Sequence, residues 1–264
     1  MIGPLAEVTY RAAPGVNWST AKYALTSGKA YANAVANPVK PTPAMRFGTA
    51  VHAAVLEPAT YAPTVVPAEF VTGSGTLSTA KAAVAWAAEH AGELLLTEAE
   101  ASEIATCAAA VTTHPAAAAL LAECPNREHA AFWTDAATGL ECKCKADAYG
   151  TDTLLDLKTY GGPWDVQAIV RECVSRRYFG QLCYYAAGLA ANGVHVAKLG
   201  LVVVQNSAPF DVAVLILDDS CTQHGDREVR DALSVIANAQ VFGYEGAFAG
   251  VITATLPKWA SREV

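Results

Sequence analysis

The first half of the chain is patterned as a series of helices. Helical spacing of apolar residues predicts helices over 17–35, 46–58, about 78–91, 97–112 and 115–123. Ser19 or Thr20 is the expected N-cap of the first helix, and Pro58 helps to end the second. The alanine density of the later stretches favours close packing between helices.

From about residue 128 the pattern changes to alternation, which is typical of strands. Residues 128–135 and 140–150 flank the turn 136–139 and predict a β-hairpin, and 152–160 predicts a third strand. The later predicted elements are helices over 163–176 and 178–193, strands over 197–205 and 210–218, and a helix over about 220–240. This order predicts an α/β fold, a mixed β-sheet core flanked by helices, with a helical N-terminal layer.

No strong linker interrupts this order, so we expect a single domain over residues 1–264. It has a helical N-terminal part (about 1–125), a core that carries the chemistry (about 126–240) and a tail (241–264). The tail is rich in aromatic residues and is expected to dock on the same chain or on a neighbouring one.

The formal net charge of −7 disfavours a protein that binds nucleic acid through overall basicity. The charge is uneven, because residues 1–50 contain only Glu7 against several basic residues: Arg11, Lys22, Lys29, Lys40 and Arg46. Two interpretations stay open for this region. It is either an ordinary solvated surface or a local surface that binds anions.

Location and thiol chemistry follow from what the sequence lacks. We find no apolar run of about 18 residues and no signal-peptide pattern, so we expect a cytoplasmic protein without a membrane span. The seven cysteines are an odd number and form no C-x-x-C pair, which favours free thiols over a metal cluster.

Charged residues interrupt the apolar stretch LLDLKTY at 154–160. Asp156 and Lys158 share one strand face, and Asp147 lies nine residues before Asp156, at the end of the preceding strand. If the two strands pair, both carboxylates meet at one edge of the sheet, where they can bind a hard cation such as Mg²⁺. The lysine can then orient a water or stabilise a phosphate. The alternative is an Asp–Lys ion pair beside an unrelated turn aspartate.

Four motifs together resemble a known nuclease family. KAD…LLDLKTY resembles the PD-(D/E)xK nuclease core, and RFGTAVHAAVLEP resembles the G-T-A-x-H-x-x-x-L-E-P segment of the RecE-type exonucleases (exonuclease VIII). EHAAFWTDAATGLECKCKAD resembles the hairpin of that family, and RRYFGQLCYYAAGL resembles its Tyr-x-x-Gln-x-x-x-Tyr helix. The motifs span about residues 17–190 in the family's order. The resemblance implies the restriction-endonuclease-like fold of the PD-(D/E)xK superfamily.

The resemblance also implies the roles of the site residues. Asp147 and Asp156 are expected to bind Mg²⁺, with the main-chain carbonyl of Leu157 completing the shell and His52 as a further ligand. Lys158 would activate or position the attacking water. Two Mg²⁺ ions are expected, with Mn²⁺ as a possible substitute and no iron–sulfur cluster.

Other residues are implied to contact DNA. Gln181 and Tyr185, one turn apart, would lie beside the scissile strand. Arg46, Lys145 and Arg177 are basic candidates for the DNA path. Lys145 stands where the family usually has an arginine, and Ala146 replaces its proline. For Glu57 we favour a structural role, with metal binding as the minor alternative, and Glu128 is expected behind the metal ligands.

The implied activity is a Mg²⁺-dependent exodeoxyribonuclease. It would degrade linear double-stranded DNA from 5′ to 3′ and expose 3′ single strands for homologous recombination. The family forms ring-shaped homo-oligomers that thread DNA ends, works with a single-strand annealing or recombinase partner, and is often phage-borne. The alternatives are a PD-(D/E)xK endonuclease, a RecB-like nuclease module, or a catalytically inactive DNA-binding ring.

Overall fold

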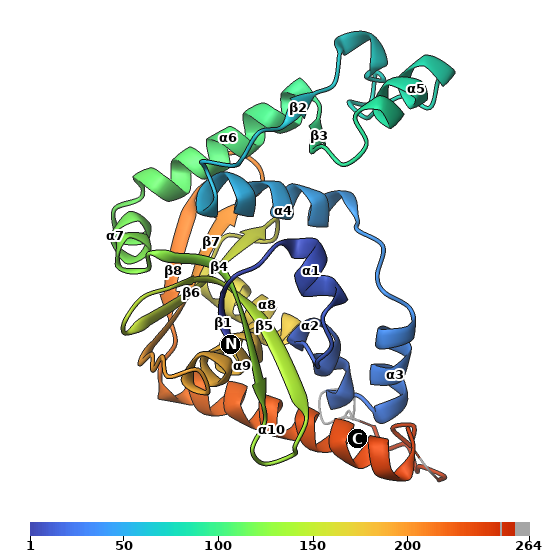
Figure 1. The fold of residues 1–264 in the computed structure, drawn as a ribbon, viewed down its shortest axis with the longest axis vertical. Coiled ribbons are helices and arrows are strands. Elements are labelled where there is room, and N and C mark those ends of the chain that lie inside the picture. The colour runs from blue at the N-terminus through green and yellow to red at the C-terminus, as the bar shows by residue number, and fades with distance from the viewer. Residues whose placement is uncertain (249, 257–264) are drawn as a thin grey trace, which may run out of the picture.

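A six-stranded mixed sheet forms the centre of the molecule in the computed structural model, which describes residues 1–248 and 250–256. The strand order is β1-β4-β5-β6-β7-β8, and all neighbours are antiparallel except the parallel pair β6 and β7 (Figure 1). The strands are β1 (Ile2–Pro4), β4 (Asn126–Thr134), β5 (Glu141–Tyr149), β6 (Thr153–Tyr160), β7 (Lys198–Gln205) and β8 (Val212–Ile216). The predicted α/β class with a mixed sheet is confirmed.

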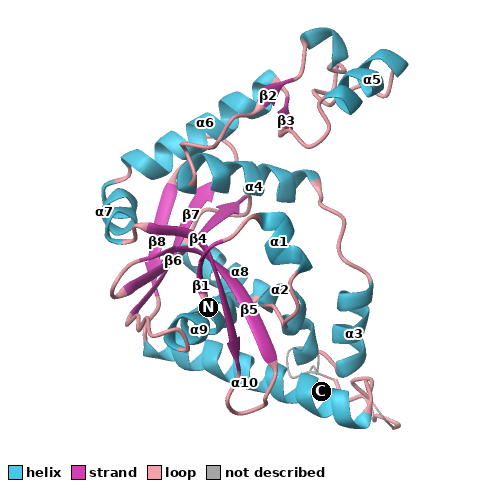
Figure 2. Ribbon diagram, in the orientation of Figure 1, coloured by secondary structure: helices cyan, strands magenta, loops and turns pink. Residues whose placement is uncertain are grey.

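Helices cover both faces of this sheet (Figure 2). The first layer contains α4 (Pro43–Leu56), α6 (Glu98–Thr113) and α7 (Pro115–Glu123), and the second contains α8 (Val166–Arg176), α9 (Tyr178–Ala190) and α10 (Asp219–Phe242). Strand β6 packs against both helix layers, since Leu155 contacts the first layer and Leu154 contacts the second. The parallel pairing of β6 and β7 follows from the crossover through α8 and α9.

The predicted helix over 17–35 is broken in the structure. It consists of α2 (Trp18–Ala21), the 3₁₀ turn η1 (Lys22–Leu25) and α3 (Gly28–Ala36). Ser27 is extended and its side chain accepts from the Ala30 N–H, so it caps a second helix. The N-cap of α2 is Asn17, whose side chain accepts from the Thr20 N–H, so the prediction of Ser19 or Thr20 is wrong.

Two segments of the N-terminal half have structure that the pattern revealed only in part: of their elements, only the helix predicted over about 78–91 is found, as α5 (Lys81–Glu89). One is the edge strand β1 with the short helix α1 (Glu7–Ala12). The other is an arm that projects from the body beyond α4 and α6 (Figure 1). The arm contains β2 (Thr64–Val65), η2 (Ala68–Phe70), α5 (Lys81–Glu89) and β3 (Leu95–Leu96).

Residues 244 and 245 of the tail contact helix α3 of the same chain. The Lys29 N–H donates to the Glu245 carbonyl at 2.9 Å, and the Tyr244 and Tyr31 rings lie 6.2 Å apart between centroids. Phe248 is exposed, and Trp259 lies outside the described residues.

All seven cysteines carry free thiols, and six of them are buried. Within the described residues, no single helix has both the length and the hydropathy needed to cross a bilayer; α6 and α7 pass that test only as a pair bent by 78°.

Candidate active site

The site lies at a fork between β5 and β6. These strands pair only at Ala148–Leu155 and Tyr149–Leu154, near their connecting turn. Asp147 and Asp156 are the next residues in that register, at the position where the ladder opens. Asp147 Oδ2 accepts instead from the Leu157 N–H at 2.8 Å. The fork thus brings together two acidic residues that the strand spacing had predicted to converge.

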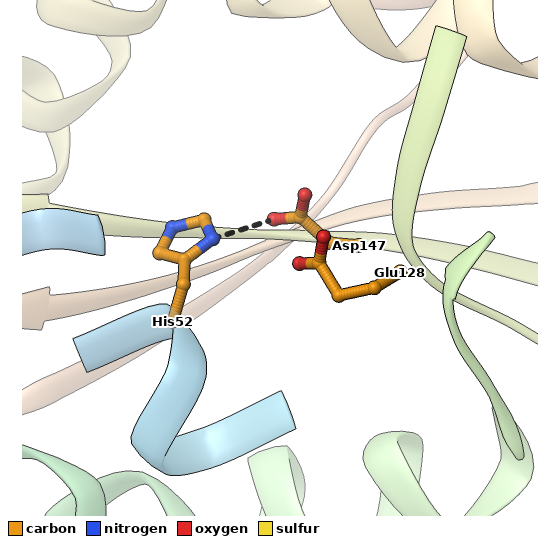
Figure 3. Close-up of side chains that lie close together, drawn as sticks. All are labelled: His52, Glu128 and Asp147. Atoms are coloured by element: carbon orange, nitrogen blue, oxygen red, sulfur yellow. Dashed lines mark ion pairs between the residues drawn. The ribbon is translucent and has the colours of Figure 1, made fainter. Parts of the chain in front are cut away.

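Three side chains from separate elements meet at this fork, and we refer to them as the donor triad. They are His52 of α4, Glu128 of β4 and Asp147 of β5, each with a ligand atom within 4.8 Å of the others (Figure 3). The His52 Nδ1 lies 3.4 Å from Asp147 Oδ2. Two carboxylates and an imidazole suit Mg²⁺ or Mn²⁺. The residues present therefore fit a divalent cation.

Glu128 was expected behind the metal ligands, and the structure places its carboxylate among the donors. Its φ of 52° is left-handed, which costs a residue other than glycine roughly 1 kcal/mol or more. The hairpin register around it pairs Arg127 with Ala148 and His129 with Ala146, so Glu128 lies opposite Asp147. The predicted hairpin with its turn at 136–139 has the same register. That pairing was the sequence signal that could have identified Glu128.

Burial and mutual repulsion disturb the titration of the donor triad. Burial and the nearby Asp147 raise the pKa of Glu128 to about 7, and burial raises the pKa of Asp147. Burial and then the Lys158 charge lower the pKa of His52 to about 4, although a hydrogen bond to the Leu157 backbone opposes the shift. The imidazole is therefore neutral at pH 7 and available as a ligand, and a cation would relieve the cost of the buried Asp147 and half-buried Glu128 carboxylates.

A second set of residues, which we call the lysine group, lies beside the donor triad. It consists of Asp156, Lys158 and Gln181. Asp156 is 1% exposed; its Oδ2 lies 2.6 Å from the Lys158 Nζ, and its Oδ1 accepts from Gln181 Nε2 at 2.9 Å. The contact confirms that Asp156 and Lys158 share one strand face. It is an ion pair rather than a well-aligned hydrogen bond.

The lysine group holds its charges differently from the donor triad. Burial raises the pKa of Asp156 to about 6. Burial alone would lower the pKa of Lys158, yet Asp156 and Asp147 raise it above its ordinary value, so this lysine is cationic at neutral pH. Its Nζ also lies 4.8 Å from the centre of the Tyr178 ring, a cation–π contact. Asp156 is outside the three residues that meet as the donor triad.

The predicted DNA contacts are not all in one place. Gln181 also donates to the Tyr185 hydroxyl at 3.0 Å, and both are beside Asp156. Lys145 lies between Glu128 and Glu7, with its Nζ 2.9 and 3.1 Å from their carboxylates. Of the two further candidates, Arg46 is exposed in the first turn of α4, and Arg177 pairs with Glu228 of α10.

A cleft of about 1170 Å³ opens over the donor triad and Lys158. That is larger than the roughly 300–1,000 Å³ of small-molecule pockets. Aromatic side chains line it together with the acidic and basic residues: Tyr10, Trp18, Tyr160, Tyr178 and Tyr185. Glu57, at the end of α4, also lines the cleft, and its charge raises the pKa of Glu128. A chain-like substrate with flat, stackable groups suits these walls.

Comparisons with known proteins agree with this geometry. Residues 18–246 match the model of a family described as "PDDEXK-like domain of unknown function (DUF3799)". A crystal structure from Eubacterium rectale, described as a "putative exonuclease", is similar with a TM-score of 0.61 at 12% identity, over 96% of each chain. No curated protein matches the sequence.

The family match and the structural match both agree with the fold that carries the fork and its charged residues. The predicted restriction-endonuclease-like core is confirmed, with the mixed sheet flanked by helices. The match to the family model covers most of the chain, from α2 to the start of the tail. This chain belongs to the PDDEXK-like family, within the PD-(D/E)xK nuclease superfamily.

Proposed function

We propose that this protein is a metal-dependent nuclease that hydrolyses DNA phosphodiesters. The observation that carries the proposal is the fork itself: a donor triad fit for a divalent cation lies beside a partly buried lysine that is held cationic. A bound cation would polarise the phosphate and lower the pKa of a water. His52, Glu128 and Asp147 would hold it, with the Leu157 backbone beside them.

Lys158 supplies charge in this proposal rather than acting as a base. Its raised pKa keeps the proton on Nζ at neutral pH, so it cannot accept one from water in that state. It can orient the water and stabilise the negative charge that develops on the phosphate oxygens. Asp156 holds the ammonium, and Gln181 in turn holds Asp156. Hydrolysis places the water oxygen on phosphorus, and the departing oxygen takes a proton.

The DNA path in this proposal runs through the cleft. Arg11 and Arg176 line it, and Lys22 lies near enough for its pKa to be lowered by burial and then by Lys158 and Arg176. These cations would contact phosphates while the aromatic walls stack on bases. Lys145 would join them only when a phosphate replaces Glu7, which now shares its ammonium.

The finer proposal is a RecE-type exodeoxyribonuclease acting from 5′ to 3′ on linear duplexes. Support comes from the motifs over residues 17–190, and the similar E. rectale structure is described as a "putative exonuclease". A homo-oligomeric ring with basic residues facing inward would reconcile a net charge of −7 with DNA binding. Exposed 3′ strands would pass to an annealing or recombinase partner in the cytoplasm of a bacterial or phage-infected cell.

One assay tests the activity and separates the alternatives. Linear and covalently closed duplexes are incubated with Mg²⁺, Mn²⁺ or EDTA. We expect the linear duplex to be degraded from its 5′ ends with metal only, leaving 3′ tails, and the closed circle to be spared. Internal cutting of circles would favour an endonuclease, and cleavage of neither substrate would favour an inactive DNA-binding ring. Solution mass tests the oligomer separately.

A further inference from the structure

The junction between α8 and α9 is a single residue, Arg177. Its backbone is left-handed, with φ 64° and ψ 36°. Glycine favours that conformation, whereas an L side chain is strained there. Contacts of the Arg177 side chain and backbone must therefore stabilise this strained conformation.

The guanidinium of Arg177 makes one such contact with Glu228 of α10. The distance from NH1 to Glu228 Oε1 is 2.5 Å, and His224 Nε2 lies 3.1 Å from the same oxygen. Glu228 is 5% exposed, and its Oε2 is buried without a hydrogen-bond partner among the described residues. A buried carboxylate of this kind is stable only with a counter-charge, and Arg177 supplies it.

The backbone of the junction is held as well. Trp18 donates from Nε1 to the Arg177 carbonyl at 2.9 Å. Gly180 allows the helices to approach, because a Cβ there would overlap the Trp18 ring and lie 2.7 Å from Glu228 Oε2. Helices α2, α9 and α10 therefore meet at this one turn, with Glu228 at the contact.

This turn is directly connected to the lysine group. Tyr178, the next residue, places its ring over Lys158, and Gln181, in the same first turn of α9, donates to Asp156. We propose that Glu228 is a positioning residue: through Arg177 it fixes the first turn of α9, and thereby the Tyr178 and Gln181 contacts that orient Lys158 and Asp156. This inference rests on the proposed nuclease function and assigns Arg177 to this ion pair instead of to DNA.

The test compares Glu228→Gln, Arg177→Gly and the double variant with wild type. Gln keeps the shape of Glu228, and Gly suits the left-handed backbone, so at least one variant is expected to fold. Asp231→Asn is the matched control, because Asp231 is exposed on the same helix. The measurements are kcat at saturating DNA, the Kd for DNA, and amide hydrogen exchange over 177–185.

We expect both single variants to lower kcat by about 10-fold, since a displaced catalytic group loses rate at that scale or more. The Kd for DNA should change by less than about twofold, and the double variant should be no slower than the slower single one, as for residues that act as a unit. Exchange over 177–185 should rise in all three and stay unchanged in Asp231→Asn.

Three results would overturn the inference. They are additive losses in the double variant, an Arg177→Gly effect that falls on the Kd for DNA, or faster exchange with an unchanged kcat. If wild type cleaves no DNA, the proposed function fails by itself. Unchanged hydrogen exchange in both Glu228→Gln and Arg177→Gly would then overturn the inference independently, because the ion pair would not be holding the first turn of α9.

Discussion

The donor triad and the lysine group each contain one buried aspartate, Asp147 or Asp156, yet they differ in how their charge is balanced. In the lysine group each oxygen of Asp156 already has a partner, Lys158 or Gln181. In the donor triad, Lys145 reaches Glu128 but is shared with Glu7, and Asp147 receives a backbone N–H and faces a neutral imidazole. The lysine group is electrostatically complete without a cofactor, and the donor triad has acceptors in excess.

The difference suggests a division of work. A buried carboxylate without a counter-charge is costly, so the donor triad should gain most from a divalent cation. In the lysine group the Asp156 carboxylate is already neutralised by Lys158, so the role of this group is to hold the Lys158 ammonium in place. Substitutions in the donor triad and in the lysine group should therefore affect metal binding and turnover in different proportions.

The largest expected effect compares the two aspartates. Asp147→Asn and Asp156→Asn should each lower cleavage by at least about 10³-fold, since an amide is a poor ligand and cannot balance Lys158. We expect Mn²⁺ to raise the thermal stability of the wild-type protein, and only Asp147→Asn should also abolish that increase. Thermal unfolding with and without Mn²⁺ measures this. Equal loss of Mn²⁺ stabilisation in both variants would show that Asp156 belongs to the metal site.

The next effect isolates the positive charge. Lys158→Ala should reduce kcat by about 10²-fold, the scale for losing a group that stabilises transition-state charge. Mn²⁺ stabilisation and the Kd for DNA should be retained, because Lys158 is not a donor residue. Lys198→Ala, which removes a surface lysine of β7, is the control. A wild-type rate in Lys158→Ala would leave Lys158 as a structural partner of Asp156 only.

Most of the sheet was predictable because its local pattern and its tertiary role agree. Strands β4 to β6 alternate or run apolar, and the turn between β4 and β5 fixes their register. The edge strand β1 has three residues, including a glycine and a proline, and carries no such pattern. In the arm the pattern predicts only α5, because the two-residue strands β2 and β3 are too short to show alternation and pair across 31 residues (95 − 64), Thr64 with Leu95. The break at Ser27 arose because a polar residue capped a new helix.

The site was predictable where chemistry follows spacing. Asp147, Asp156 and Lys158 follow from strand alternation, whereas His52, 95 residues before Asp147 (147 − 52), could be identified only by its motif. The pairing of Arg177 with Glu228 joins residues 51 positions apart through helix packing. No local rule reports such a contact, so the sequence offered Arg177 only as a basic candidate for the DNA path.

A smaller expected effect tests whether the donor triad has more carboxylate acceptors than its surroundings can balance without a metal. In the folded protein Glu128 keeps its proton up to about pH 7, whereas its ordinary pKa is 4.5. Between these values the folded state binds more protons than the unfolded state, so the stability of the metal-free protein falls as pH rises through this window. Glu128→Gln removes that loss and should raise the free energy of unfolding by on the order of 2 kcal/mol at pH 8.

Urea unfolding with EDTA at pH 8 and pH 4.5 measures this gain. The gain should vanish at pH 4.5, where Glu128 is largely protonated in the folded wild type and the linkage cost is small. The same variant should lose part of its stabilisation by Mn²⁺, because it removes a donor. A variant that is less stable than wild type at pH 8 would mean that the Lys145 contact outweighs the repulsion by Asp147.

The smallest expected effect concerns the Tyr178 ring, which lies against Lys158 of the lysine group. A cation over an aromatic face gains about 1 kcal/mol when partly desolvated, so losing the face should lower kcat by about 5-fold. Tyr178→Leu removes the face, and Tyr178→Phe keeps it while removing the hydroxyl. We therefore expect Leu to lose more than Phe in kcat at saturating DNA, with Mn²⁺ stabilisation the same in both. Equal losses would show that the hydroxyl matters and not the ring, and Lys158 would then depend on Asp156 alone for its position.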